Sequence, residues 1–286
     1  MKPQRSLSTL LGAILGTICA LALAAHAGDY PGKLTEEFHH SYPLSAGGRV
    51  ELSNINGAVH ITAWDQNEVK VDAVKYANTK ERLDEAHIEV DAESDSVSIR
   101  TKYRDHDLTW DSDGSNNPAS VEYTLMVPRS AHLDEIKLVN GPLDVTGVAG
   151  QVRASCVNGH MLAKGLQGET KLSTVNGRME AQFDRVPNTH VELSSVNGTL
   201  DVTLPSDVNA EVEASTVNGG IENDFGLHVN HHRWVGHDMH GEFGSGGPHI
   251  RLSNVNGRID VHRASDGRAM SPVKDLGRKE KDEGEI

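Results

Sequence analysis

The sequence predicts an all-β protein built as a single-stranded β-solenoid, a parallel β-helix-like stack of short coils. The first observation behind this prediction is a Val-Asn-Gly motif that recurs between residues 134 and 263. Its asparagines step by 18, 18, 21, 21 and 38 residues from Asn140 to Asn256. A repeat of about 18–21 residues is typical of a structural unit that stacks on its neighbours, not of a catalytic motif.

Alternation within each repeat is the second observation. From His190 to Val208, apolar residues alternate with polar ones, which is typical of half-buried strands. Each repeat is therefore predicted to contain a strand, a bend at Asn-Gly, a second strand and a closing turn, because glycine accepts positive φ and asparagine tolerates the left-handed region. The bends are predicted at Asn56, Gly57, Asn140, Gly141, Asn158, Gly159, Asn176, Gly177, Asn197, Gly198, Asn218, Gly219, Asn256 and Gly257.

Rows of equivalent positions that stay apolar almost throughout are the third observation. They favour coils that stack in register and bury a continuous core. Antiparallel hairpins packed as a sandwich are the alternative, since Asn-Gly is also the favoured two-residue hairpin turn. Three rows are predicted to point inward: Ile136, Val152, Thr170, Val191 and Val212; then Val139, Val157, Val175, Val196 and Val217; then Leu143, Met161, Met179, Leu200 and Ile221.

Two longer intervals interrupt the period. The 38 residues from Asn218 to Asn256 are about two periods, so one copy between them is predicted to have lost its motif. The 84 residues from Asn56 to Asn140 equal four periods of 21, which would allow the coils to continue upstream without Asn-Gly bends.

The chain begins with a predicted secretory signal over residues 1–27. Lys2 and Arg5 precede an apolar run, and Ala25-His26-Ala27 is a small-residue cleavage site. No second hydrophobic run follows, so we expect no transmembrane segment in the mature chain. The product is expected to be exported to the periplasm or to the cell surface or extracellular space.

Residues 28–133 form the next predicted region, an irregular N-terminal β region that caps or continues the stack. Strands are expected at 49–52, 58–63, 68–76, 87–92 and 97–103, and a short helical turn at 79–85. Residues 104–119 are a polar segment, which is expected to be a functional loop or disordered. The repeat solenoid follows over 134–263, and residues 264–286 lose the alternation and are predicted to be a disordered charged tail.

Charge and cysteine content argue against nucleic-acid binding and against an internal disulfide. Without Lys2 and Arg5 the mature chain has 25 basic residues against 41 acidic ones, so nucleic acid is not an expected partner. Cys156 is the only cysteine beyond the signal, which excludes an internal disulfide. It is predicted to be a small ladder residue, in the slot that Thr174 and Ser195 fill in other repeats.

An acidic row is the first candidate site. It follows the third inward row by one residue, and on stacked strands its carboxylates would lie about 4.8 Å apart. We expect either a solvated outer face or a Ca²⁺-binding or carbohydrate-contacting stripe. The Asp-rich segment 105–113 is a second calcium candidate that lacks the spacing of an EF-hand. The row is Asp144, Glu180, Asp201, Glu222 and Asp260, with Leu162 in the remaining position.

A histidine-rich stretch is the second candidate site. Neutral imidazole binds Zn and Cu well, while the surrounding glycines predict a loop and not a helical hydrolase motif. The predicted metal ligands are His228, His231, His232, His237, His240 and His249.

A resemblance to a known family follows from these motifs. The serial Val-Asn-Gly units, the phrase Val121-Glu-Tyr-Thr-Leu-Met-Val-Pro128 and the earlier Ile61-Thr-Ala-Trp64-Asp65 resemble the bacterial "putative adhesin" β-strand-repeat family. That family is a domain of unknown function related to the head GIN domain. The resemblance spans residues 38–261, and it implies an exported β-solenoid without established catalytic residues.

The sequence therefore favours a non-enzymatic, envelope-associated scaffold or adhesin-like protein that binds an envelope component or another protein and needs no cofactor. Two alternatives stay open. One is a periplasmic protein that binds Zn, Cu or Ca, using the loop from His228 to His249 in the first two cases. The other is a polysaccharide-active β-helix enzyme, although the acidic row is spread along the coils and aromatic residues make up only 4% of the chain.

Overall fold

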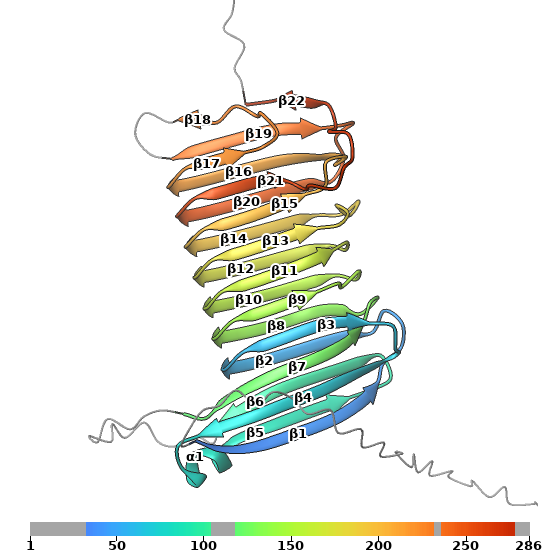
Figure 1. Cartoon of the computed structure of the whole chain (residues 1–286), viewed down its shortest axis with the longest axis vertical. Helices are drawn as coiled ribbons and strands as arrows, with labels where there is room; N and C mark the ends of the chain where they lie inside the picture. Colours follow the sequence, from blue (N-terminus) through green and yellow to red (C-terminus); the bar gives the residue numbers. More distant parts are fainter. Residues whose placement is uncertain (1–32, 104–117, 232–235, 278–286) are drawn as a thin grey trace, which may run out of the picture. The chain divides into compact units, whose positions relative to one another are not determined.

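The computed structural model describes residues 33–103, 118–231 and 236–277. The predicted signal, the Asp-rich segment 105–113 and His232 lie outside the described residues. Within them the protein is all-β, as predicted, with two large sheets and the short helix α1 (Lys80–Glu85) (Figure 1). No helix of the described residues has the length and apolar character that a membrane span requires.

The first sheet has ten strands. Its strands pair in this order: β1 (Leu34–Pro43), β4 (Glu68–Ala77), β7 (Ser120–Pro128), β3 (Val59–Trp64), β9 (Leu143–Thr146), β11 (Met161–Leu166), β13 (Met179–Phe183), β15 (Leu200–Leu204), β21 (Ile259–Arg263) and β17 (Ile221–Asn223).

The second sheet has twelve strands. They pair in this order: β18 (Asn230–His231), β19 (His237–Phe243), β16 (Ala210–Asn218), β20 (His249–Asn256), β14 (Val191–Asn197), β12 (Thr170–Asn176), β10 (Val152–Asn158), β8 (His132–Asn140), β2 (Arg49–Asn56), β6 (Ser96–Tyr103) and β5 (Ala86–Ala92), while β22 (Val273–Asp275) pairs with β19.

Each Val-Asn-Gly repeat contributes one strand to each sheet. The chain runs along β10 in the twelve-stranded sheet, bends at Asn158-Gly159 and returns along β11 in the ten-stranded sheet. Equivalent strands pair in parallel and in register, as β10 does with β12 and β13 with β15. The antiparallel hairpin alternative is therefore wrong for the repeats, because the two strands of one repeat belong to different sheets.

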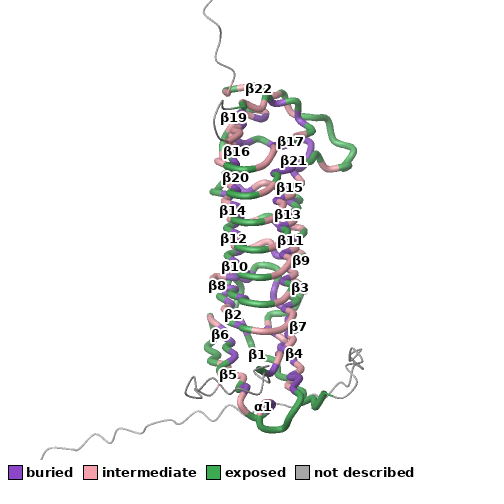
Figure 2. The backbone as a smooth tube through the Cα atoms, turned by 90° about the vertical axis from the view of Figure 1, so that its left-hand side faces the viewer, coloured by how far each residue is buried: buried purple, intermediate pink, exposed green. Residues whose placement is uncertain are grey.

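The core lies between the two sheets, where buried positions alternate with more exposed ones along repeat strands such as β10 and β13 (Figure 2). The first and third predicted rows are buried throughout. The second predicted row is wrong, because Val139, Val157, Val175, Val196 and Val217 are 37% to 46% exposed. Val152 and Val157 are five residues apart, and a side-chain period of two cannot place both on one face.

The residue before each of these valines points inward instead, and it is small in every case except Leu138. Cys156 pairs in register with Thr174, and Thr174 with Ser195, which agrees with the predicted ladder slot. Several side chains at this position bond to the backbone of a neighbouring coil. Thr216 Oγ1, for example, donates to the carbonyl oxygen of Gly257 at 3.0 Å.

The last repeat departs from the order of the chain. Strands β20 and β21 lie between the coil of β14 and β15 and the coil of β16 and β17, and both pairings are parallel (Figure 1). Between β17 and β20, the described residues form β18 and β19 and no further coil, and β19 pairs antiparallel with β16. The prediction that one copy had lost its motif is therefore wrong.

The N-terminal interval has a similar explanation. Strand β2 pairs directly with β8, and Asn56 lies opposite Asn140, so no coils separate them. The described residues between them form β3 to β8 and α1, and β4 pairs antiparallel with β1 and β7, as β5 does with β6. The predicted strands and helical turn are present, and Thr79 caps α1 by accepting from the Arg82 backbone N–H.

The predicted disordered tail begins too early in the sequence. Residues 264–277 contain β22, which pairs antiparallel with β19. The backbone N–H groups of Ala264 and Ser271 donate to the carbonyls of Leu204 and Ser206. Polar composition alone did not reveal this segment, because a strand at a sheet edge needs few apolar side chains. Residues 278–286 lie outside the described residues.

Candidate functional site

The predicted Asn-Gly bends all lie at one edge of the two sheets. Their asparagine side chains form a ladder in which each side-chain amide nitrogen donates to the side-chain oxygen of the asparagine before it in the spatial order given next, with six bonds of 2.9 Å. In spatial order the ladder is Asn56, Asn140, Asn158, Asn176, Asn197, Asn256 and Asn218. This ladder joins every motif-bearing coil to its neighbour and follows spatial order, not chain order.

The motif glycines are required by close packing between coils. A Cβ at Gly159, Gly177 or Gly257 would lie 1.9 Å from the carbonyl oxygen of the neighbouring motif glycine. Gly177 also has φ +148. The bends were predicted from φ alone, whereas the structure shows that the space above each glycine is occupied by backbone.

A flat polar and apolar surface lies beside the asparagine ladder, on the outside of the twelve-stranded sheet. We call it the Ser-Val face. A shallow groove of about 330 Å³ runs over it and is lined by serines and valines of β10, β12, β14 and β20. Its apolar row is Ile55, Val139, Val157, Val175, Val196, Val255 and Val217, and its serine row is Ser53, Ser155, Ser173, Ser194, Ser253 and Ser215, with Lys137 in register between Ser53 and Ser155.

The Ser-Val face was missed in the sequence because the valines were assigned to the core. A strict count of two residues from Val152 through Ala154 and Cys156 places Ser155 and Val157 outside. Parallel pairing then puts equal side chains on adjacent strands, about 4.8 Å apart. The face therefore repeats the same hydroxyl and methyl groups from coil to coil.

The acidic row lies on the outside of the ten-stranded sheet, and its members are neighbours as predicted. Leu162 pairs with Asp144 on one side and Glu180 on the other. Beyond them come Asp201, Asp260 and Glu222, because β21 lies between β15 and β17. The four carboxylates from Glu180 to Glu222 are thus on consecutive strands.

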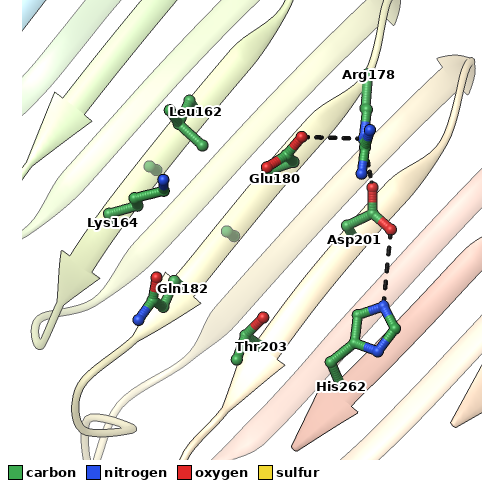
Figure 3. A pocket seen from close by; sticks show the side chains of 10 residues that line it. Leu162, Lys164, Arg178, Glu180, Gln182, Asp201, Thr203 and His262 are labelled. Atoms are coloured by element: carbon green, nitrogen blue, oxygen red, sulfur yellow. Dashed lines mark hydrogen bonds and ion pairs between the residues drawn. The ribbon is translucent and has the colours of Figure 1, made fainter. Parts of the chain in front are cut away.

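Two arginines neutralise part of this row. Arg178 Nε lies 2.6 Å from Asp201 Oδ2 and 3.0 Å from Glu180 Oε1 (Figure 3). Arg258 Nε lies 2.9 Å from Asp260 Oδ2, and its Nη1 lies 3.5 Å from Glu222. A shallow depression of about 150 Å³ lies beside Arg178, lined also by Glu180, Asp201 and His262. Each arginine therefore bridges two carboxylates of the row.

Asp260 differs from the rest of the row because it is buried, with 3% of its surface exposed. Burial raises the pKa of its carboxyl group, Arg258 opposes that shift, and the neighbouring carboxylate of Asp201 adds to it. Its Oδ1 has no hydrogen-bond partner among the described residues. Burying a carboxylate oxygen without a partner costs free energy, and a proton or a cation beside this atom would reduce that cost.

His262 completes the cluster around Asp260. Its Nδ1 lies 3.2 Å from Asp224 Oδ2, and its Nε2 lies 4.0 Å from Asp201 Oδ1. One ligand atom each from Asp201, Asp260 and His262 lies within 4.8 Å of the other two, and no other such group of three occurs in the described part of the chain. The sequence reasoning missed His262, although Asp260 and His262, two apart on one strand, had to share a face.

The predicted histidine ligands separate into smaller groups. The rings of His231 and His237 are 4.6 Å apart, and His249 stacks on His190 at 5.9 Å. His240 Nε2 lies 2.7 Å from Glu211 Oε1. His228 contributes its backbone N–H to a hydrogen bond with Asp275. Since His232 lies outside the described residues, the full histidine set stays a prediction.

Comparisons with known proteins give distant structural likenesses. A "putative cell adhesion protein" from Clostridium sporogenes is 12% identical, with a TM-score of 0.46 over 80% of this chain and 100% of that chain. A "putative adhesin" from Bacteroides fragilis is 11% identical, with a TM-score of 0.36 over 80% of this chain and 97% of the other. A "putative lipid binding protein" from Parabacteroides distasonis is 10% identical, with a TM-score of 0.28 over 82% and 98%. No family model matches the chain, and no curated protein does.

Proposed function

We propose that this protein is an exported, non-enzymatic β-solenoid scaffold whose Ser-Val face binds an envelope component or a protein partner. The observation that carries this proposal is the contiguous row of seven exposed Ile and Val side chains along the asparagine ladder. Contiguous exposed apolar surface is typical of interaction sites, whereas single exposed apolar residues are ordinary.

The chemistry of the face favours an extended partner. Valine methyl groups supply apolar contact, and each serine hydroxyl can donate one hydrogen bond and accept two. Because these groups repeat at the strand spacing, a partner that is itself extended can make the same contact on several coils. A weak contact repeated on one rigid surface increases the total affinity without a deep pocket.

Export is supported by the amino-terminal residues 1–27, which have the pattern of a secretory signal. The excess of acidic residues in the mature chain favours solubility.

The test is retention of an envelope component by the immobilised mature chain, residues 28–286. The variant Val157→Glu/Val175→Lys/Val196→Glu places three charges on the Ser-Val face, with alternating signs so that neighbouring strands do not repel each other. Because these side chains are exposed, we expect the fold to persist and retention to fall at least tenfold.

The matched control is Thr146→Glu/Gln182→Glu on the opposite face. Together with the natural Lys164 it presents charges on β9, β11 and β13, where all three side chains are exposed. We expect the control to retain as much of the component as the natural protein. Equal retention by all three proteins, or equal loss in both variants, would show that the Ser-Val face is not the binding surface.

A further inference from the structure

We infer that Asp201, Asp260 and His262 form a binding site for one divalent transition-metal ion of the Zn²⁺ or Mn²⁺ class. The three residues belong to β15 and β21, which are adjacent in the ten-stranded sheet although 59 residues separate Asp201 from Asp260. The site is separate from the Ser-Val face, since it lies on the other sheet.

In each of the two aspartates, one carboxylate oxygen contacts an arginine and the other does not. Arg178 occupies Oδ2 of Asp201, and Arg258 occupies Oδ2 of Asp260. The remaining Oδ1 of Asp201 faces His262, while Oδ1 of Asp260 has no hydrogen-bond partner among the described residues. Each aspartate therefore keeps one oxygen available for a cation, and the one on Asp260 is shielded from solvent.

The second argument is the orientation of the imidazole. His262 Nδ1 lies 3.2 Å from Asp224 Oδ2, so an N–H at this position donates to the carboxylate. The lone pair then lies on Nε2, the nitrogen that faces Asp201. A ligating histidine commonly donates its other ring N–H to a carboxylate in this way, which fixes its tautomer and increases its basicity.

The third argument is the local charge. The group contains five carboxylates and two guanidinium groups, so the carboxylates exceed the cations by three when His262 is neutral. These residues are Glu180, Asp201, Glu222, Asp224, Asp260, Arg178 and Arg258. Neighbouring carboxylates on adjacent strands repel one another, and a divalent ion would relieve that repulsion.

The ligand set selects the class of metal. Imidazole suits Zn and other first-row transition ions, whereas Ca²⁺ and Mg²⁺ prefer oxygen ligands alone. Two carboxylates and one imidazole leave at least one position for water. The ion would connect the out-of-order strand β21 to β15, so metal binding is expected to stabilise this part of the stack.

The experiment titrates the EDTA-treated mature chain with Zn²⁺, Mn²⁺ and Ca²⁺ separately, by calorimetry and by thermal unfolding. We expect Zn²⁺ or Mn²⁺ to bind at this site more tightly than Ca²⁺ and to raise the melting temperature. His262→Ala and Asp260→Asn should each weaken binding at least tenfold. His262 is half exposed, so its alanine variant tests the site even where Asp260→Asn alters the fold.

Two controls separate this site from other metal-binding groups. His60→Ala/Asp144→Asn removes another histidine–aspartate pair of the ten-stranded sheet, which is joined at 2.8 Å but does not belong to a group of three possible ligands. His231→Ala/His237→Ala removes the paired rings of the histidine-rich stretch. Both should keep the affinity and the thermal shift of the natural protein.

Several outcomes would overturn the inference. They are no binding of Zn²⁺ or Mn²⁺, tighter binding of Ca²⁺, or an affinity that falls in the controls and not in His262→Ala. The titration needs no envelope partner. Failure here and failure of the proposed Ser-Val binding are therefore distinguishable.

Discussion

The coils from β10 to β15 follow the order of the chain, whereas the coil of β20 and β21 lies between two earlier coils. The contacts are the same in both regions. The ladder bond from Asn176 to Asn158 and the one from Asn256 to Asn197 are both 2.9 Å. The motif glycines also approach the neighbouring backbone equally closely, since a Cβ at Gly177 or at Gly257 would lie 1.9 Å from a carbonyl oxygen.

This comparison teaches that the Val-Asn-Gly motif specifies how two coils fit together but not which coils are neighbours. Any coil with the motif presents the same asparagine amide and glycine backbone to both sides. The order of the coils in space is therefore set by the segments that connect them. The segment between β17 and β20 contains β19, which pairs with the outer side of β16 and leaves the inner side for β20.

The largest effect that tests the equivalence of the two regions comes from the core. Leu172 on β12 and Leu252 on β20 are both fully buried. Replacing either by alanine removes apolar contacts and leaves a cavity, which costs about 2–5 kcal/mol of unfolding free energy. If the out-of-order coil is as well integrated as the others, the two variants lose similar stability in urea titrations.

The shape of the unfolding curve sharpens this test. One cooperative transition in both variants indicates that β20 and β21 unfold with the rest of the stack. A separate early transition in Leu252→Ala alone would show that the out-of-order coil is a unit of lower stability. A loss below about 1 kcal/mol in Leu252→Ala would contradict its place in the core.

The next effect concerns the glycine at the bend. Gly198 has φ +141, and a Cβ there would lie 2.0 Å from the carbonyl oxygen of Gly177. Gly198→Val is therefore expected to lower the unfolding free energy by about 2–4 kcal/mol, through backbone strain and a clash between coils. Chemical denaturation measures the loss.

Gly220→Ala is the matched control for this substitution. Gly220 directly follows a motif glycine, yet no atom lies within 4 Å of an added Cβ. Its replacement should change stability by less than about 0.5 kcal/mol. Equal losses in both variants would mean that glycine matters here for chain flexibility and not for the approach of neighbouring coils.

Sequence alone predicted the strands, the bends and the register of equivalent positions, because these depend on local alternation and on a repeated motif. It did not predict that β20 and β21 lie out of order, because the spacing of the motif along the chain does not determine which coils are neighbours in space. The acidic row was predicted from one position per repeat. The group around Asp260 was not, because it needs Asp224 and His262 from strand ends that carry no motif.

The smallest expected effect tests the correction of the valine row. Val175 is 39% exposed, whereas Val202 is fully buried. The same change to threonine should therefore cost less than about 0.5 kcal/mol at Val175 but about 1–3 kcal/mol at Val202, where a hydroxyl would be buried among apolar side chains. Denaturation of the two variants side by side measures the difference. If Val175→Thr cost as much as Val202→Thr, the valines of the motif would belong to the core after all, and the Ser-Val face would lose its apolar row.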